Sequence, residues 1–484
     1  MGTNSAGLQP EQSDTGALSR AFAALSLRCV ECAALYPGLE AQPRYRCECG
    51  GVLDVETVFQ HPWPQEESLQ EGYNALASAE NDLMPLAGAS WRQLFDERAT
   101  RPPIWSVAEG SLLLDYSGVW RYRELILPLP PTMIVSRPEG NTSLYPVGIE
   151  NCGDGREGHQ RIGQFAGVER LFLKHEGENP SGSFKDRGMT VGISMAKASG
   201  ARAVACASTG NTSASLASYA AQVGLPCFVF LPAGHVAAGK LAQTLAYGAT
   251  TIQIDGDFDD AMRLVEQVCH EMGVYLLNSL NPYRIEGQKA IGFELLQQLD
   301  WQAPDWLVLP AGNLGNTSAI GKAFLQAHQL GLIGHLPRIA AIQASGANPF
   351  YRSYMNAFAS REPVQAHTVA TAIKIGNPVS YTRARRVIEQ TNGVVEQASD
   401  EEILAAMSII DRAGIGCEPA SAATLAGLRK LAARGIIKRD ERVVGILTGH
   451  LLKDSVTGIP QQPQNAAVAA NIDAVRTLLQ GFLQ

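Results

Sequence analysis

Residues 202–232 read RAVACASTGNTSASLASYAAQVGLPCFVFLP. A short β-rich run opens this stretch, a helix-length pattern rich in Ala and Ser follows, and a second apolar run closes it. Two such runs separated by one helical pattern are typical of a strand–helix–strand unit with parallel strands. The stretch therefore predicts the α/β fold class.

The same alternation continues toward the C-terminus. Further strands are predicted over 250–255 and 306–313, and further helices over 236–248, over 258–272 and from about residue 316. This order is typical of a parallel sheet with helices on both faces. In such sheets, ligands bind in the loops beyond the carboxyl ends of the strands. We therefore expect the functional residues in those loops.

Length and charge narrow the function classes. The chain has 484 residues, of which 18% are charged, and a formal net charge of −8. This length predicts two to four domains. The acidic balance, with no basic block, argues against a nucleic-acid partner. No run of 18 apolar residues occurs, so no transmembrane span is predicted.

Composition shifts divide the chain into five predicted regions. Residues 1–25 are predicted to be a disordered lead-in without a signal pattern, and residues 26–55 a zinc-ribbon-like module. Residues 56–135 are predicted to be an N-terminal extension that carries no recognisable functional motif. The regular alternation occupies 136–458. A linker and a helix follow over 459–484, and Ile472, Val475, Leu479 and Phe482 mark its apolar face. This helix is expected to pack on the body or on a partner subunit.

Nine cysteines, five of them scattered through apolar segments, indicate a reducing cytoplasm. The other four, Cys29, Cys32, Cys47 and Cys49, follow a C-x2-C-x14-C-x-C pattern that resembles a zinc ribbon. The second pair is one residue short, which is expected to strain tetrahedral coordination. The expectation is therefore a ribbon that folds without metal, with bound zinc as the alternative, and no metal ligand is assigned.

The word GNTS occurs three times, at Gly140–Ser143, Gly210–Ser213 and Gly315–Ser318. The flanking sequences differ and the spacings match no usual repeat, so shared loop chemistry is the better explanation. The second and third copies each follow a predicted strand and open a predicted helix, where backbone N–H groups bind anions. The first copy receives no role.

One lysine stands out because of the loops that accompany it. Lys185 lies in NPSGSFKDRG, just before a helical pattern. Two small-residue loops, GNLGN at 312–316 and STGNTS at 208–213, open helices and can converge N–H groups on an anion. Neither a Walker lysine–serine pair nor a dinucleotide fingerprint is present. A lysine able to form a Schiff base beside a phosphate cradle points to pyridoxal phosphate.

Seven stretches between residues 137 and 454 carry a resemblance. They are NPSGSFKDRGMT, ACASTGNTSAS, LNSLNPYRIEGQK, PAGNLGNTSA, ATAIKIGNP, GCEPASAATLAG and LTGHLLKD. In this order the chain resembles the threonine synthases, which are fold-type-II pyridoxal-phosphate enzymes. The resemblance implies two open, twisted, mostly parallel sheets with flanking helices, a smaller subdomain over about 185–275, and a homodimer. It also implies conversion of O-phospho-L-homoserine and water to L-threonine and phosphate.

The resemblance implies roles for individual residues. Lys185 would hold the cofactor and then move protons on the substrate, Asn211 would bond the cofactor ring oxygen, and Thr448 would face the pyridine nitrogen. The residues implied to cup the cofactor phosphate are Gly312, Asn313, Leu314, Gly315 and Asn316. The residues implied to bind the substrate carboxylate are Ser208, Thr209 and Thr212. Asn278, Ser279 and Arg284 are implied to clamp the substrate's own phosphate.

Several alternatives stay open. Glu418 either caps its helix or takes part in the site, whereas His175 and His450 are expected to be structural. Rival functions on the same scaffold are a cysteate synthase acting on phosphoserine and a serine/threonine dehydratase. A rival of another class is a non-catalytic paralogue. The joint presence of Lys185, Asn211 and Thr448 argues against it, because a binding protein need not keep all three.

Overall fold

The structure is a computed structural model that describes residues 25–38, 44–57, 84–100, 114–150, 153, 155–233, 238–256, 258–454 and 469–483. The predicted lead-in, except Leu25, lies outside the described residues. So do residues 58–83 and 101–113 of the predicted extension and residues 459–468 of the predicted linker.

The larger sheet has six strands in the order β12-β11-β10-β13-β5-β4. These strands are β4 (Leu144–Pro146), β5 (Arg170–His175), β10 (Trp306–Pro310), β11 (Arg338–Ala344), β12 (Val394–Ala398) and β13 (Arg442–Leu447). Every pairing is parallel except that of β4 with β5 at one edge. The predicted parallel α/β arrangement is confirmed.

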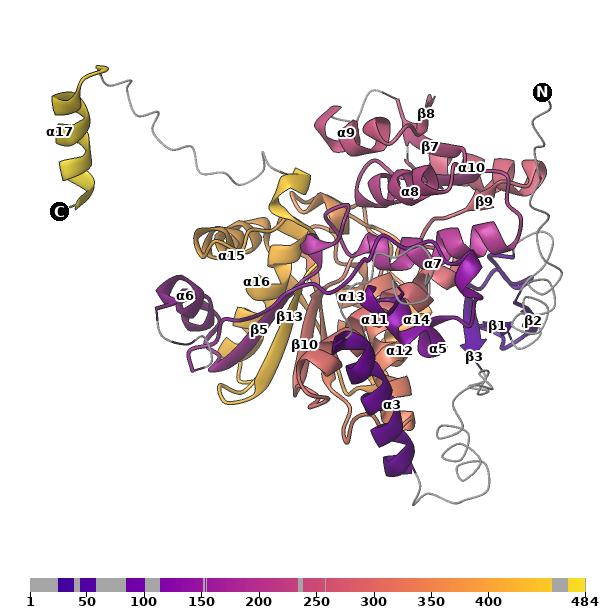
Figure 1. Ribbon diagram of the computed structural model, residues 1–484, viewed down its shortest axis with the longest axis horizontal. Coiled ribbons are helices and arrows are strands. Elements are labelled where there is room, and N and C mark those ends of the chain that lie inside the picture. Colours follow the sequence, from indigo (N-terminus) through magenta and orange to yellow (C-terminus); the bar gives the residue numbers. More distant parts are fainter. Residues whose placement is uncertain are drawn as a thin grey trace, which may run out of the picture.

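Both faces of this sheet are apolar and both are covered by helices (Figure 1). On β10, Trp306 and Val308 pack into the core shared with α16 (Pro419–Ala433). The alternate residues, Leu307 and Leu309, belong to the core that contains α11 (Pro282–Gln298) and α12 (Gly315–Gln329). Because successive side chains of a strand point to opposite faces, continuous apolar runs such as WLVLP fit a sheet covered on both sides.

The second sheet is smaller and wholly parallel, in the order β8-β7-β6-β9. Its strands are β6 (Val204–Ala207), β7 (Cys227–Pro232), β8 (Thr250–Ile254) and β9 (Tyr275–Leu276). On β6, Ala205 and Ala207 pack with α10 (Phe258–Met272), while Val204 and Cys206 share a core with α8 (Asn211–Gln222). α9 (Ala238–Ala246) and α7 (Lys185–Ala198) both pack against α8.

The remaining helices lie around the larger sheet and at the chain ends. They are α3 (Met84–Thr100), α5 (Arg123–Ile126), α6 (Glu157–Ala166), α13 (Pro349–Met355), α14 (Tyr381–Gln390), α15 (Asp400–Arg412) and α17 (Ile472–Leu483). α17 stands apart from the body with Ile472 and Leu479 exposed (Figure 1). Among the described helices, none is both long and apolar enough to cross a bilayer.

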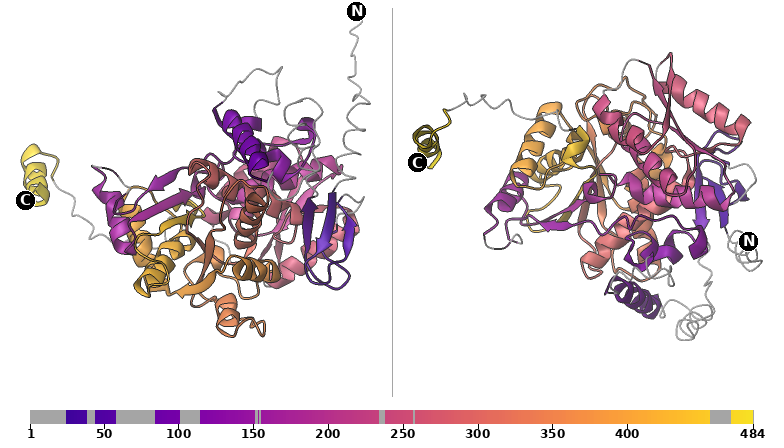
Figure 2. Two further views of the ribbon diagram at one scale, coloured as in Figure 1. Left: turned by 90° about the horizontal axis from the view of Figure 1, so that it is seen from below. Right: turned by 45° about the horizontal axis from the view of Figure 1, so that its top comes forward.

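A three-stranded antiparallel sheet in the order β2-β1-β3 lies along one edge of the body (indigo in Figure 2). It consists of β1 (Leu25–Cys29), β2 (Leu35–Pro37) and β3 (Leu53–Thr57). These strands span the predicted zinc-ribbon-like module and extend one residue before it and two after it, and its four cysteines lie at their turns. We call residues 25–57 the ribbon.

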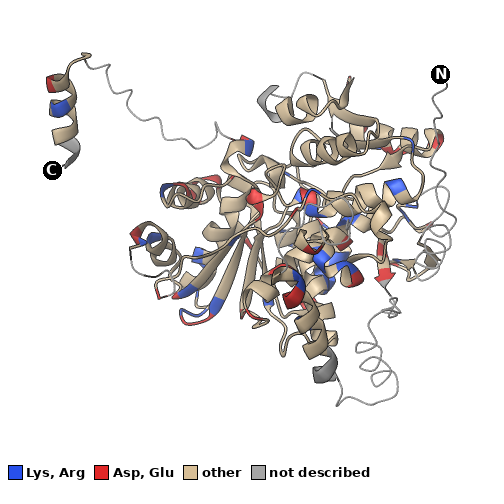
Figure 3. Cartoon of the chain, in the orientation of Figure 1, with Lys and Arg blue, Asp and Glu red and all other residues tan. Residues whose placement is uncertain are grey.

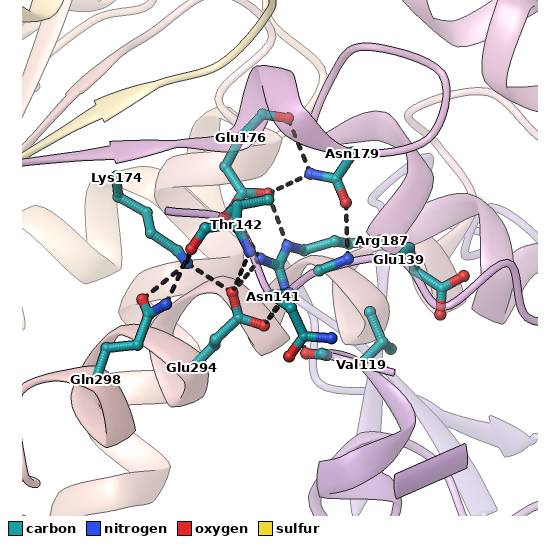
Figure 4. A network of polar contacts seen from close by, with 12 residues as sticks. Val119, Glu139, Asn141, Thr142, Lys174, Glu176, Asn179, Arg187, Glu294 and Gln298 are labelled. Atoms are coloured by element: carbon teal, nitrogen blue, oxygen red, sulfur yellow. Dashed lines mark hydrogen bonds and ion pairs between the residues drawn. The ribbon is translucent and has the colours of Figure 1, made fainter. Parts of the chain in front are cut away.

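Charges of both signs gather at the centre of the body, where α7 and α11 meet (Figure 3). Arg187, on α7, is fully buried and pairs with Glu176 at 2.6 Å and with Glu294 of α11 at 2.8 Å. Lys174 of β5 pairs with Glu294 at 2.5 Å (Figure 4). Burial raises the pKa of Glu294, but the charges of Arg187 and Lys174 outweigh it and hold this pKa well below its ordinary value.

The first GNTS copy receives a role from this network. The backbone N–H groups of Asn141 and Thr142 donate to the Glu294 carboxylate at 2.8 and 3.1 Å, and Gly140 N–H donates to Asn179 Oδ1. Gly140 and Asn141 both have positive φ, at 87° and 50°. Successive residues of this kind make a concave anion-binding loop. The anion bound here is a carboxylate of the protein itself.

Glu294→Gln is expected to lower the free energy of unfolding by roughly 3–5 kcal/mol, because it leaves Lys174 and part of Arg187 buried without a counter-charge. The depressed pKa means that the carboxylate stabilises the fold above its unfolded pKa and loses this effect as pH falls through the folded pKa. Urea denaturation at neutral pH measures the full difference.

The matched control is Glu389→Gln, whose carboxylate pairs with Arg385 on the exposed face of α14. An exposed pair of this kind contributes about 0.5 kcal/mol or less. Equal losses in the two variants would contradict a structural role for the buried network.

Candidate active site

The segment before Lys185 is held from both sides. Asp186 accepts hydrogen bonds from the Ser181 backbone at 2.6 Å and from the Ser181 and Ser215 hydroxyls at 2.5 Å. On the opposite side, Phe184 N–H donates to Thr448 O at 3.0 Å, and Ser183 forms an isolated bridge with Gly449. Lys185, the first residue of α7, is thereby fixed between α8 and the loop that follows β13.

Lys185 sits where its ammonium form is disfavoured. Burial and then the positive charge of Arg284 lower its pKa to about 7, and the Glu418 carboxylate opposes them. The Lys185 Nζ lies 4.1 Å from the centre of the Phe184 ring. A substantial share of the amine is therefore neutral near pH 7, as both a nucleophile and a proton acceptor require.

Glu418 bonds across the site. Its carboxylate accepts from the Asn211 amide at 3.0 and 3.2 Å, and its side chain makes no capping bond to α16. Burial raises the pKa of Glu418, although the Asn211 bond acts against this. A Cβ at Gly449 would come within 2.4 Å of this carboxyl, so any larger residue there would displace the Glu418 carboxylate. Of the two roles left open by the sequence, the structure favours participation in the site.

The 312–316 loop forms a tight entry to α12. A side chain on Gly312 would lie 2.8 Å from the Ile373 backbone, so only glycine allows this approach. Leu314, the residue before the helix, is left-handed at φ 64°. The Asn313 side-chain oxygen accepts a hydrogen bond from Val379 N–H at 2.7 Å, which holds the 312–316 loop to the segment before α14. The first N–H groups of α12 lack intrahelical partners and are available to an anion.

The side chains at this helix start are also available. Asn316 is 6% exposed, and neither end of its amide has a hydrogen-bond partner among the described residues; the buried Thr317 hydroxyl is likewise unpaired. Buried polar groups are ordinarily satisfied, so unpaired ones imply a ligand. A neutral amine at Lys185, together with these free donors at a helix N-terminus, fits the aldehyde and the phosphate of pyridoxal phosphate.

The 208–212 loop leaves the carboxyl end of β6 and enters α8. Ser208, Thr209 and Thr212 are half-buried, and Gly210 N–H donates to the Ser208 hydroxyl at 3.3 Å. The loop thus presents hydroxyls and the first N–H groups of α8 on the side of the sheet where ligands bind. Asn211 begins α8 and reaches Glu418, as described above.

The three residues predicted to clamp the substrate phosphate differ in how they are bonded. The Asn278 amide is bonded at both ends to the Ala207 backbone, at 2.8 and 2.9 Å, so it fixes the 208–212 loop. Arg284 is 1% exposed, and its guanidinium donates only to Leu277 O at 3.2 Å within the described part of the chain. Its Nε has no partner among the described residues. Burial lowers the pKa of Arg284 to about 10. Ser279 is half-buried between them.

Thr448 and the two histidines have defined contacts. The Thr448 hydroxyl is buried and lies 3.0 Å from the Ser421 hydroxyl of α16. His175 uses both ring nitrogens, with Gly416 O and Gly177 N–H as partners. His450 Nδ1 accepts from Leu452 N–H. These bonds agree with the structural role expected for both histidines.

Sequence reasoning missed Gln288. This buried residue of α11 has an unpaired Oε1 that would lie 3.7 Å from a side chain on Gly315, and its Nε2 would lie 3.0 Å from one on Gly188. Gln288 therefore lies between the start of α7 and the start of α12. A buried polar side chain one turn after Arg284 in LNPYRIEGQK was the available signal.

Comparisons with known proteins identify the fold and the family of the chain. The sequence model of the family described as "Pyridoxal-phosphate dependent enzyme" matches residues 158–449. Among solved structures, maize serine racemase gives a TM-score of 0.54 at 20% identity, covering 71% of this chain and 93% of that one. Diaminopropionate ammonia lyase from Escherichia coli gives 0.54 at 15% identity, covering 77% and 91%. At such identities these structures show the fold alone, which confirms the fold-type-II expectation.

Curated relatives are nearer in sequence. The threonine synthase of Methanosarcina acetivorans is 50% identical over 366 residues, which cover 75% of this chain and 87% of that protein. The threonine synthase of Methanocaldococcus jannaschii is 40% identical over 454 residues, covering 93% and 98%. Threonine synthase 2, chloroplastic, of Arabidopsis thaliana is 35% identical over 489 residues, covering 94% and 91%. With the family match extending across Lys185 and the 312–316 loop, these identities show that the chain belongs to the threonine synthases, within the pyridoxal-phosphate-dependent enzymes.

Proposed function

We propose that the chain converts O-phospho-L-homoserine and water to L-threonine and phosphate, and that the residues gathered around Lys185 carry this reaction. The observation that supports the substrate is the presence of two separate anion sites. The 312–316 loop fits the cofactor phosphate, and Arg284 offers a second, buried guanidinium without an acidic partner among the described residues. A substrate that carries its own phosphate uses both sites.

The cofactor is held by residues with matching chemistry. Lys185 provides the amine, and the 312–316 loop with Asn316 provides donors for the phosphate. Asn211, which bonds Glu418, would also reach the cofactor's ring oxygen, and the Thr448 hydroxyl would face the pyridine nitrogen. When bound, pyridoxal phosphate supplies an electron sink that stabilises the electron pair left at Cα after proton removal.

Lys185 is the proton carrier. With a pKa of about 7, its amine takes the Cα proton, releases it and then takes a Cβ proton, and its ammonium form later gives protons to Cγ and Cα. The bond from Cγ to the phosphate oxygen breaks as the second electron pair moves, and water then adds its oxygen at Cβ. The atoms balance: one water enters, and one phosphate and one threonine leave.

The substrate's two acidic groups have separate partners. Ser208, Thr209 and Thr212, at the N-terminus of α8, bind the α-carboxylate. Arg284 and Ser279 bind the phosphate that leaves, because a guanidinium offers a planar fork of donors. Asn278 acts indirectly, since its amide ties these two segments together through Ala207.

We further propose a homodimer in the cytoplasm. The exposed apolar face of α17, which includes Ile472 and Leu479, supports a partner contact. All eight cysteines among the described residues are free thiols, which is typical of a reducing compartment. Size-exclusion chromatography with light scattering tests the dimer.

The rival reactions differ in whether the substrate carries a phosphate and in how long that substrate is. A dehydratase has no use for a second phosphate clamp, and a cysteate synthase acts on the shorter phosphoserine. Phosphate release is therefore measured from phosphohomoserine and phosphoserine side by side. Faster turnover of phosphohomoserine with threonine as product supports the proposal, and a preference for phosphoserine contradicts it.

Lys185→Ala is expected to abolish phosphate release, because it removes the amine that holds the cofactor and moves the protons. Lys197→Ala is the matched control, since Lys197 lies in the last turn of the same helix and donates to Thr132 O at the surface. Full activity is expected in the control. Residual turnover in Lys185→Ala above the background of the solution reaction would contradict the assigned role.

The reactivity of Lys185 in cofactor-free protein reports its pKa directly. Because this pKa is lowered to about 7, the fraction of neutral amine rises with pH and levels off above neutrality. The rate of acetylation at Lys185, followed by mass spectrometry, should rise about tenfold per pH unit below 7 and then reach a plateau. Arg284→Met should move the midpoint upward, because a neighbouring positive charge is removed. A rate still rising at pH 10 would exclude the lowered pKa.

Arg284→Met tests the phosphate clamp. Losing hydrogen bonds to a charged phosphate should lower kcat/KM for phosphohomoserine roughly 10- to 100-fold. The melting temperature should stay equal or rise, because a buried unpaired charge is replaced by an apolar side chain. Arg385→Met, on the exposed face of α14, should leave kcat/KM unchanged. Unchanged turnover in Arg284→Met would remove this residue from the site.

A further inference from the structure

The four cysteines of the ribbon meet at one point. Cys29 and Cys32 flank the turn after β1, while Cys47 and Cys49 lie in the turn before β3. Their sulfurs all lie within 4.8 Å of one another, with Cys29 to Cys49 and Cys32 to Cys47 both at 3.5 Å. Among the described residues, no other group of three or more His, Cys, Asp or Glu side chains comes together in this way.

These separations match a metal-centred tetrahedron. Four sulfurs at about 2.3 Å from a zinc ion lie about 3.8 Å from one another. A disulfide requires about 2.05 Å between sulfurs, and all four cysteines are free. The sulfurs are therefore too far apart to be bonded in pairs and close enough to share one ion.

The short second pair is accommodated by two glycines. Gly50 N–H donates to Cys47 O, and Cys47 N–H donates to Gly51 O, both at 2.8 Å, so the turn closes around Cys49. Gly50 has φ 85°, which favours glycine, and a side chain on Gly51 would lie 2.8 Å from the Cys29 sulfur. The strain expected from the C-x-C spacing is thus relieved by the Gly50-Gly51 pair.

Donors surround the sulfurs, as they do in metal–thiolate sites. The N–H groups of Glu31 and Cys32 point to the Cys29 sulfur at 3.4 and 3.5 Å. The Tyr36 hydroxyl lies 3.0 Å from the Cys47 sulfur. Such outer contacts orient the ligands and stabilise their negative charge. Four thiolates in a closed tetrahedron are typical of structural zinc, with no position left for catalysis.

We propose that the ribbon binds one zinc ion through Cys29, Cys32, Cys47 and Cys49, and that this ion stabilises the wall of the active site that carries Arg284. The connection runs through the residues beside the ligands. Val30 and Val52 form a small core with Leu280, and Val379 packs against it. Leu280 lies between Ser279 and Arg284, and Val379 bonds Asn313 of the 312–316 loop.

Polar contacts make the same connection. The Tyr45 hydroxyl accepts from Leu276 N–H at 2.9 Å, and the Tyr45 ring meets Tyr275 edge-on at 6.1 Å. The Tyr283 hydroxyl donates to Gly38 O. Residues 275–284 are therefore held by the ribbon at both ends. Without the ion, the two cysteine turns separate, and this segment loses its support.

The other side of the ribbon is attached to the larger sheet's helices. Asp54 pairs with Arg383 of α14 at 2.6 Å, and Val55 O accepts from Lys322 of α12 at 2.7 Å. The ribbon thus contacts both halves of the body. The zinc site itself does not depend on the identity of the substrate, but its effect on substrate binding rests on the proposed function.

The metal content of the full-length protein tests the site. Protein expressed in zinc-supplemented medium should hold about one zinc per chain by elemental mass spectrometry. Cys32→Ser and Cys49→Ser should each lower this content sharply. Both thiols are exposed, so neither change disturbs the core. Cys227→Ala, a buried cysteine of β7, is the control and should keep the zinc.

Cobalt gives an independent readout on the wild-type chain. Replacing zinc with Co²⁺ should produce the thiolate charge-transfer and visible bands of a tetrahedral sulfur site. Iron in place of zinc, or wild-type protein with no zinc and no cobalt–thiolate bands, would overturn the metal site.

The link to the active site is tested by hydrogen–deuterium exchange on wild type and Cys49→Ser. Faster exchange in residues 276–284, together with a higher KM for phosphohomoserine at similar kcat, is the expected result. Unchanged exchange in this segment would refute the supporting role. Because metal content and exchange require no substrate, they remain decisive even if phosphohomoserine is not turned over.

Discussion

The Arg187–Glu294 ion pair is the constraint on which the rest of the structure depends. Both groups are fully buried, and a charge in this position is tolerated only when it is paired. Arg187 is two residues from Lys185, so the pair that neutralises it also fixes where α7 begins. The Glu294 carboxylate in turn gathers the backbone of the 140–142 loop and the Lys174 ammonium. One carboxylate therefore joins the loop before β4, strand β5, helix α7 and helix α11.

Helix α11 connects the buried Glu294 ion pair to the candidate active site. Along a single helix, Glu294 lies in the ion network, Gln288 lies between the starts of α7 and α12, and Arg284 faces the region of Lys185. The spacing of these three residues is fixed by helix geometry. The charge of Arg284 can then lower the pKa of Lys185 while its guanidinium keeps a single hydrogen bond, to Leu277 O, among the described residues. A buried, unsatisfied arginine costs stability, and anion recognition is the gain that offsets it.

Much of this arrangement could be predicted from the sequence because it is local. The strand over 250–254 and the helix over 258–272 follow from hydrophobic periodicity, and Lys185 follows from the loops that accompany it. Contacts between distant segments could not be predicted in this way. Asn211 and Glu418 meet across 207 positions, and Arg187 meets Glu294 across 107. Nor could the spacing of the cysteines show that a positive φ at Gly50 closes their turn.

The ribbon's double attachment has a consequence for motion. It contacts β9 and α11 on one side and α12 and α14 on the other, so it connects both sheets at one edge of the body. If the smaller sheet rocks against the larger one when substrate enters, displacement is smallest along this edge and largest at the opposite one. A motion of this kind would therefore turn about the edge that the ribbon holds.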